Sequence, residues 1–148
     1  MKKAAAFLGA ALILLSAVWL LVGDPVVAWH NDRLKRRILL LKTGDVVTLE
    51  TLVPFPWERV CTFAPYTGKH QIEEQIGFRS GSVQETVSEG MVQLLFVKEN
   101  SVTASICGYA DALGYRITLE DSVSYGENIP FETNVRAGIV ELTQRPQE

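Results

Sequence analysis

The chain has 148 residues, of which 47 % are hydrophobic, and a formal net charge of −3, values that fit one small domain. The charge is uneven: residues 29–43 carry a net charge of +4, whereas residues 44–148 contain seven Lys and Arg against fifteen Asp and Glu. Because a nucleic-acid interface needs a basic patch on the domain itself, this acidic part argues against binding of DNA or RNA.

The N-terminal segment predicts a membrane helix. A pair of lysines precedes residues 4–22, which contain no charge and only Ser16 as a polar side chain. As a helix this stretch would extend about 28 Å, close to the thickness of the bilayer hydrocarbon. Residues 26–28 (Val-Val-Ala) are typical of a signal-peptidase site. Residues 1–28 are therefore either a retained signal-anchor, which the apolar length favours, or a cleaved signal peptide.

The orientation of this anchor has two solutions. Basic residues in segment 29–43 outnumber the N-terminal lysine pair, which by the positive-inside rule favours a cytoplasmic domain. A basic pair at the extreme N-terminus is nevertheless the usual design of an exported chain. We therefore expect a single-pass membrane protein with its globular part in the periplasm or outside the cell. A cleaved, secreted form and a membrane-tethered cytoplasmic domain are the alternatives.

Residues 29–43 form a basic juxtamembrane segment. Leu34, Ile38 and Leu41 recur in it at helical spacing, which predicts a short amphipathic helix. Its basic residues either attract anionic headgroups, with Trp29 at the interface, or belong to a solvated stalk that flanks the anchor. The stalk is favoured, because basic residues are common beside any membrane segment.

Residues 44–148 predict an acidic α+β domain, with one small antiparallel sheet of four or five strands and a short helix on one face. In chain order the pattern predicts a strand over 45–50, although residues 49–52 could equally begin a turn of helix. A strand over 57–63, a helix over 68–76 capped by Thr67, and a surface loop over 78–90 follow. There follow a hairpin of residues 91–97 and 102–107, a strand over 115–119, and a closing strand over 131–142 with a bulge or break at Gly138.

The stretch 57–67 joins a strand to this helix through a proline corner. Its apolar side chains alternate, so Trp57, Cys61 and Phe63 are expected to face the core. A second interpretation is an aromatic groove that binds a protein partner. The residues of this groove would be Trp57, Arg59, Pro65 and Tyr66. The core interpretation is favoured, because aromatic residues at period two are what sheet packing uses.

The residues Trp-Glu-Arg-Val-x-x-Phe-x-Pro-Tyr-Thr of this stretch resemble a segment of small, uncharacterised bacterial envelope proteins that carry an N-terminal signal or anchor. The chain departs from that family at Cys61, where an aromatic or aliphatic residue is expected. The resemblance implies an envelope location and carries no activity with it.

Two cysteines, Cys61 and Cys107, fall within predicted strands. In an exported domain they could form a disulfide, but two buried free thiols are the favoured alternative. The sequence contains no Cys-x-x-Cys motif and no Cys/His pair at ligand spacing, so it predicts no metal site.

The sequence offers little for catalysis, and no catalytic residue is predicted. His30 and His70 have no visible partner, and Glu73 and Glu74 are adjacent on a helix and therefore diverge. The glycines form no phosphate loop, so no cofactor is predicted. The leading hypothesis is a non-enzymatic binding module for an envelope protein, held at the membrane by residues 4–22. A small envelope hydrolase, with a site assembled across the sheet, is the alternative from the enzyme class.

Overall fold

The computed structural model describes Gly9, Ile13, Ser16 and residues 23–145 of the chain. The predicted membrane segment 4–22 lies almost entirely outside these residues. No helix in the described part of the chain is both long and apolar enough to cross a bilayer. The elements in chain order are α2 (Pro25–Ile38), β1 (Val46–Thr48), α3 (Leu49–Leu52), β2 (Arg59–Cys61), α4 (Lys69–Ile76), β3 (Met91–Lys98), β4 (Ser101–Tyr109), α5 (Ala110–Leu113), β5 (Tyr115–Thr118), β6 (Val123–Ser124), β7 (Pro130–Arg136) and β8 (Ile139–Gln144).

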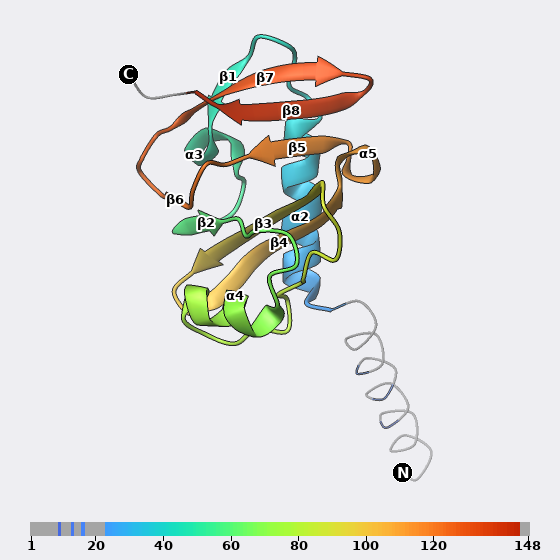
Figure 1. The fold of residues 1–148 in the computed structure, drawn as a ribbon, viewed down its shortest axis with the longest axis vertical. Coiled ribbons are helices and arrows are strands. Elements are labelled where there is room, and N and C mark those ends of the chain that lie inside the picture. Colours follow the sequence, from blue (N-terminus) through green and yellow to red (C-terminus); the bar gives the residue numbers. More distant parts are fainter. Residues whose placement is uncertain (1–8, 10–12, 14–15, 17–22, 146–148) are drawn as a thin grey trace.

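The α+β class is confirmed, but the single sheet is wrong. The strands form two four-stranded sheets, ordered β1-β7-β8-β5 and β4-β3-β2-β6, which Figure 1 shows one above the other. All described pairings are antiparallel except β5 with β8, which is parallel. The predicted hairpin is present as β3 and β4, joined by a tight turn at residues 99–100. The strands β2, β3 and β4 correspond to predicted strands, but β6 is only two residues long and was not predicted. The division into two sheets depends on which strands pair, and a local pattern does not show that.

The predicted closing strand is a second hairpin. β7 and β8 pair antiparallel, with Arg136 opposite Ile139, so only Ala137 and Gly138 form the turn. Both turn residues have positive φ, 50° and 79°. Two-residue hairpins favour such backbones, because their twist matches that of the strands. Gly138 therefore reverses the chain, where the sequence predicted a bulge or break.

Strand β3 is buried on both faces and separates two apolar clusters. Val92, Leu94 and Phe96 belong to the main core, which also contains the inward residues of the other sheet. Leu95 and Val97 point the other way and pack with Ile72 and Ile76 of α4. This alternation follows from the period-two geometry of a strand. The predicted helix thus covers the outer face of the second sheet.

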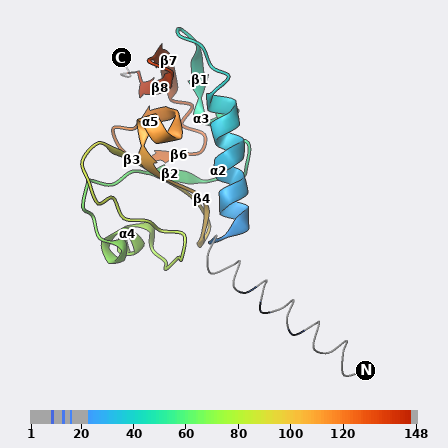
Figure 2. The same ribbon diagram turned by 90° about the vertical axis from the view of Figure 1, so that its right-hand side faces the viewer.

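Helix α2 is part of the same domain. Leu34 and Ile38 are completely buried in the main core, and the helix runs along one flank of the domain beside β4 (Figure 2). The predicted helix in segment 29–43 is therefore confirmed, but the solvated stalk is wrong for it. Its spacing of apolar residues serves to bury one face against the sheets.

The edge of β4 is closed by polar side chains from α2. The amide of Asn31 donates to the carbonyl of Ser105 at 2.8 Å and accepts from the N–H of Ser105 at 3.0 Å. Nδ1 of His30, the preceding residue of the helix, lies 2.6 Å from the carbonyl of Thr103. An open edge strand would otherwise expose unpaired backbone groups that can recruit another chain.

Replacing Asn31 by alanine should leave the N–H and carbonyl of Ser105 unpaired. We expect the free energy of unfolding to fall by about 1 to 3 kcal/mol, as for other half-buried polar groups that lose their partner. Chemical denaturation measures it. The matched control is Asp32→Ala on the same helix, which removes an exposed ion pair with Arg36 and should cost at most about 1 kcal/mol. Equal losses in both variants would contradict this role of Asn31.

Glu50 of α3 holds the loop that precedes β7. Its Oε1 accepts hydrogen bonds from the N–H groups of Gly126, at 3.0 Å, and Asn128, at 3.1 Å. Partial burial by itself raises the pKa of this carboxyl group, but the backbone hydrogen bonds outweigh it, and the pKa lies below its ordinary value of 4.5.

A lowered carboxyl pKa in the folded state makes stability depend on pH. The contribution of Glu50 is complete above the pKa of the unfolded chain and is lost as pH falls through the folded pKa. We expect Glu50→Gln to flatten the loss of unfolding free energy between roughly pH 5 and pH 3, measured by denaturation at each pH. Glu89→Gln, which changes an exposed glutamate, should leave the wild-type slope. A Glu50→Gln slope equal to the wild type would refute the assignment.

Candidate functional site

Trp57 does not belong to a surface groove. Only 4 % of its surface is exposed, and its ring meets Phe96 and Tyr125 edge-to-face at centroid distances of 5.9 and 5.3 Å. These are favourable aromatic geometries in a core. The structure places Trp57 in the core, which is the favoured interpretation, and separates it from the three other residues of the predicted groove.

Arg59 lines a small pocket between β2, α4 and the loop before β6. The pocket has a volume of about 160 Å³, and Cys61, Phe63 and Asp121 also line it. Burial raises the pKa of the Cys61 thiol, and the nearby Arg59 guanidinium only partly opposes this. A neutral thiol is a weak nucleophile, so Cys61 is poorly suited to attack a substrate in this pocket.

The two cysteines do not form a disulfide; both are free. Cys61 of β2 lies opposite Leu95 of β3, whereas Cys107 of β4 lies opposite Gln93 of β3. Strand β3 therefore separates them. Strands two places apart are roughly 10 Å apart, whereas a disulfide needs Cα atoms within about 7 Å. The possible disulfide is contradicted by this strand order, which the spacing of the two cysteines does not reveal.

Pro65 and Tyr66 lie at the surface, in the turn before α4. Tyr66 is 64 % exposed and has a φ of 65°, a left-handed backbone that is uncommon for a tyrosine. Its N–H donates to the carbonyl of Thr86 at 3.0 Å, with the Thr86 hydroxyl at 3.2 Å. Thr86 itself is buried, so the turn is hydrogen-bonded to a residue in the interior of the domain.

A second exposed apolar side chain lies beside this turn. Val87 follows Thr86 directly and is 72 % exposed, and the bonds between Thr86 and Tyr66 join the two segments. We call the surface formed by Pro65, Tyr66 and Val87 the Tyr66 corner. Sequence reasoning found Pro65 and Tyr66 but missed Val87, because no local signal shows that the Thr86 segment bonds to Tyr66, twenty residues earlier.

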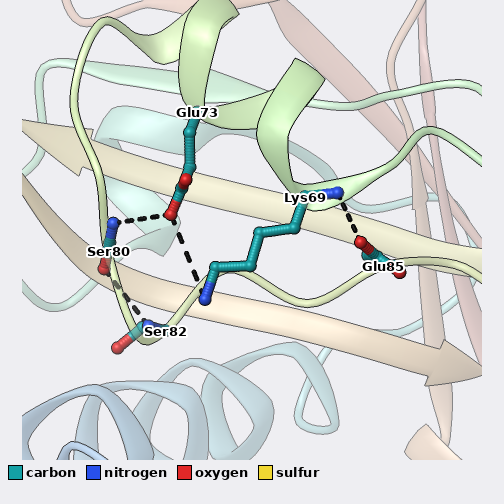
Figure 3. Close-up of polar contacts among 5 residues, drawn as sticks. All are labelled: Lys69, Glu73, Ser80, Ser82 and Glu85. Atoms are coloured by element: carbon teal, nitrogen blue, oxygen red, sulfur yellow. Dashed lines mark hydrogen bonds and ion pairs between the residues drawn. The ribbon is translucent and has the colours of Figure 1, made fainter.

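The segment behind the Tyr66 corner is held by hydrogen bonds. The carbonyl of Gln84 accepts from the amide of Gln93 at 2.8 Å, and the carboxylate of Glu85 accepts from the backbone N–H of Lys69, as Figure 3 shows. Nearer the start of the same loop, the N–H of Ser80 donates to the carboxylate of Glu73 of α4 at 3.0 Å. The predicted surface loop 78–90 is thus tied to α4 and β3 at several points.

The helix itself begins differently from the prediction. Its N-cap is Gly68, which has no side chain to accept a capping hydrogen bond. The hydroxyl of Thr67 donates backwards to the carbonyl of Ala64 at 2.7 Å. Thr67 therefore tightens the proline corner and does not cap α4. This bond also helps to fix the backbone on either side of Tyr66.

A shallow pocket of about 330 Å³ lies against α4. His70, Glu73 and Glu74 contribute to its walls. Nδ1 of His70 lies 3.4 Å from the carboxylate of Glu74, and both side chains are largely exposed, so solvent screens their attraction. Glu73 turns inward to the loop instead, which confirms that the two glutamates diverge. Within the described residues no three His, Cys, Asp or Glu side chains are grouped as a metal site.

No family model, curated protein or solved structure matches this chain. The resemblance of residues 57–67 to uncharacterised envelope proteins therefore stays a prediction.

Proposed function

We propose that this protein is a non-enzymatic binding domain, tethered to the membrane outside the cytoplasm, that docks a protein partner at the Tyr66 corner. The observation that carries the proposal is the exposed tyrosine in a left-handed backbone, fixed by the buried Thr86. A conformation of this kind costs about 1 to 3 kcal/mol and persists only where the surrounding structure enforces it. Strained backbones of this kind cluster at active sites, ligand clamps and switch regions.

The Tyr66 corner has the properties of a docking surface. Tyrosine is a frequent anchor of protein interfaces, because it brings a large contact area with few rotatable bonds. A proline precedes it and Val87 stands beside it, so the exposed patch is apolar at its centre. Because hydrogen bonds already hold its backbone, docking orders few groups and loses little conformational entropy.

The charge around the corner favours one class of partner. Glu85 and Glu89 stand on either side of Val87 in the chain, and both are exposed. Acidic residues at the rim of an interface select a partner with basic residues around its own apolar centre. We therefore expect an envelope protein with an apolar patch surrounded by Lys and Arg.

Photo-crosslinking in native membranes tests this site. A photoreactive phenylalanine analogue at position 66 should give one dominant protein adduct, and Val87→Asp should abolish it. The matched position is Tyr125, an equally exposed tyrosine in a different loop, where the adduct should be absent. The same adduct at positions 66 and 125, or an adduct insensitive to Val87→Asp, would reject the Tyr66 corner as the docking site.

A reporter enzyme fused after Glu148 tests the location. Alkaline phosphatase should be active in this fusion, because it needs an oxidising compartment to form its disulfides. A fusion that is inactive, together with a fluorescent cytoplasmic reporter that is active, would instead support the membrane-tethered cytoplasmic domain.

A small envelope hydrolase is the second candidate, and the pocket against α4 favours it. That pocket places His70 beside Glu74, a pair that can transfer a proton. Hydrolysis of ester, peptide or phosphoester substrates that His70→Ala abolishes, and that Glu89→Ala leaves unchanged, would establish the hydrolase. Absence of turnover in such a screen is the result that the binding domain predicts.

A further inference from the structure

One side of α2 remains exposed after the other is buried in the domain. Val26, Trp29, Arg33 and Arg36 lie on it, pointing within about 80° of one another at 100° per residue. Arg33 is half-buried and the other three are exposed, and Leu40 continues the row in the turn after the helix. Trp29 is 56 % exposed and Leu40 is 78 % exposed. We call this row the α2 stripe.

The chemistry of the α2 stripe is that of a bilayer interface. It contains one tryptophan, two arginines and two aliphatic side chains. The guanidinium carbon of Arg33 lies 4.8 Å from the centroid of the Trp29 ring, which holds a charge and an indole side by side. Tryptophan prefers the headgroup level, where arginine binds lipid phosphate.

The charge distribution of the chain also favours contact between the α2 side of the domain and an anionic surface. The segment 29–43 carries a net charge of +4, whereas residues 44–148 carry −8. An anionic surface therefore attracts the α2 side of the domain and repels the remainder. Within the stripe Arg36 is paired with Asp32 at 2.9 Å, but that pair is exposed, so a phosphate can compete for it.

The link between the apolar segment and α2 is too short for the start of the helix to lie far from the membrane. The apolar segment ends at Val22 and α2 begins at Pro25, and the two intervening residues span at most about 7 Å. If residues 4–22 cross the bilayer, as the proposed tether requires, the first turn of α2 lies at the headgroups. Because α2 is built into the core, it cannot swing away as a free stalk.

We infer that the α2 stripe binds anionic phospholipid headgroups and seats the domain with α2 against the bilayer. This inference rests on the proposed tether and goes beyond it, since it assigns a lipid-binding face and an orientation to the folded domain. Seated in this way, the domain turns its acidic surfaces away from the lipid.

Fluorescence of the full chain in nanodiscs tests the inference. The discs contain either phosphatidylcholine alone or equal parts of phosphatidylcholine and phosphatidylglycerol, with lipids brominated just below the headgroup as quenchers. Subtracting the emission of Trp29→Phe isolates Trp29 from the two other tryptophans. We expect lipid quenching of Trp29 to be about twofold stronger in the anionic discs, and high salt to remove that difference.

Charge variants provide the control. Arg33→Gln with Arg36→Gln should reduce the quenching of Trp29 to its level in phosphatidylcholine, whereas Arg79→Gln with Arg136→Gln, an equal loss of charge at exposed positions elsewhere, should not. Quenching that is equal in both lipids, or equal in both double variants, overturns the lipid face alone. A chain that fails to enter either disc overturns the tether, and the lipid face with it.

Discussion

Replacing Leu34 by alanine should lower the free energy of unfolding by about 2 to 5 kcal/mol, the range for leucines truncated in a core. Leu34 has no exposed surface and packs in the main cluster with Ile38 and the inner faces of both sheets. The truncation leaves a cavity between α2 and the sheets that rigid strands cannot close.

Leu40→Ala is the matched control, because it makes the same chemical change only six residues away. Leu40 is exposed, and its truncation should change stability by no more than about 0.5 kcal/mol. Urea denaturation followed by circular dichroism measures both variants. Two leucines with equal and small effects would show that α2 is not packed on the domain.

Trp57→Ala should cost about 3 to 5 kcal/mol of unfolding free energy, as large aromatic truncations in a core do. The indole lies in the main cluster, where it meets Phe96 edge-to-face and carries Tyr125 on its outer side. Its loss removes buried apolar area and two aromatic contacts together.

Trp29→Ala tests whether that cost depends on burial. Trp29 is more than half exposed and its described contacts are an arginine above its ring and the neighbouring His30, so its truncation should cost less than about 1 kcal/mol. If Trp57→Ala instead unfolds at the wild-type denaturant concentration, Trp57 is not a core residue, and the aromatic groove becomes the better interpretation.

Features with strong local signals were predictable from the sequence. The hairpin of β3 and β4 was found from two apolar β-branched runs around a short polar turn. Helix α4 was found from its apolar spacing and from Gly77, which has a φ of 90° where the helix ends. In each case residues close in sequence determine the structure, so no tertiary information was needed.

Features that depend on distant partners were not predictable in this way. The existence of two sheets depends on which strands pair, which no local pattern shows. The predicted strand over 57–63 contains β2, whereas the two residues of β6 are too few for a periodic pattern. Leu34 and Ile38 are buried because the sheets lie against α2, which the sequence does not show. Beside a membrane segment, the helical spacing of apolar residues in 29–43 is equally typical of a stalk. Cys61 and Cys107 were placed in strands, but only the strand order shows that β3 lies between them.

The candidate site was predicted in part for the same reason. Pro65 and Tyr66 stood out because proline corners and exposed aromatic residues have local signatures. The groove failed because Trp57 points into the core. Thr86 and its neighbour Val87 were missed because Thr86 bonds to Tyr66 across twenty residues. The sequence therefore indicated Pro65 and Tyr66 of the Tyr66 corner, but not Val87, which lies in a loop distant in sequence.

The most direct test of this account is hydrogen exchange of the full chain in nanodiscs, because both the seating of the domain and its lipid face require α2 to be an integral element. The amides of α2 should open with the same free energy as those of β3, as members of one cooperative unit do. Amides of α2 that exchange at the rate of an unstructured peptide, while those of β3 stay protected, would contradict it.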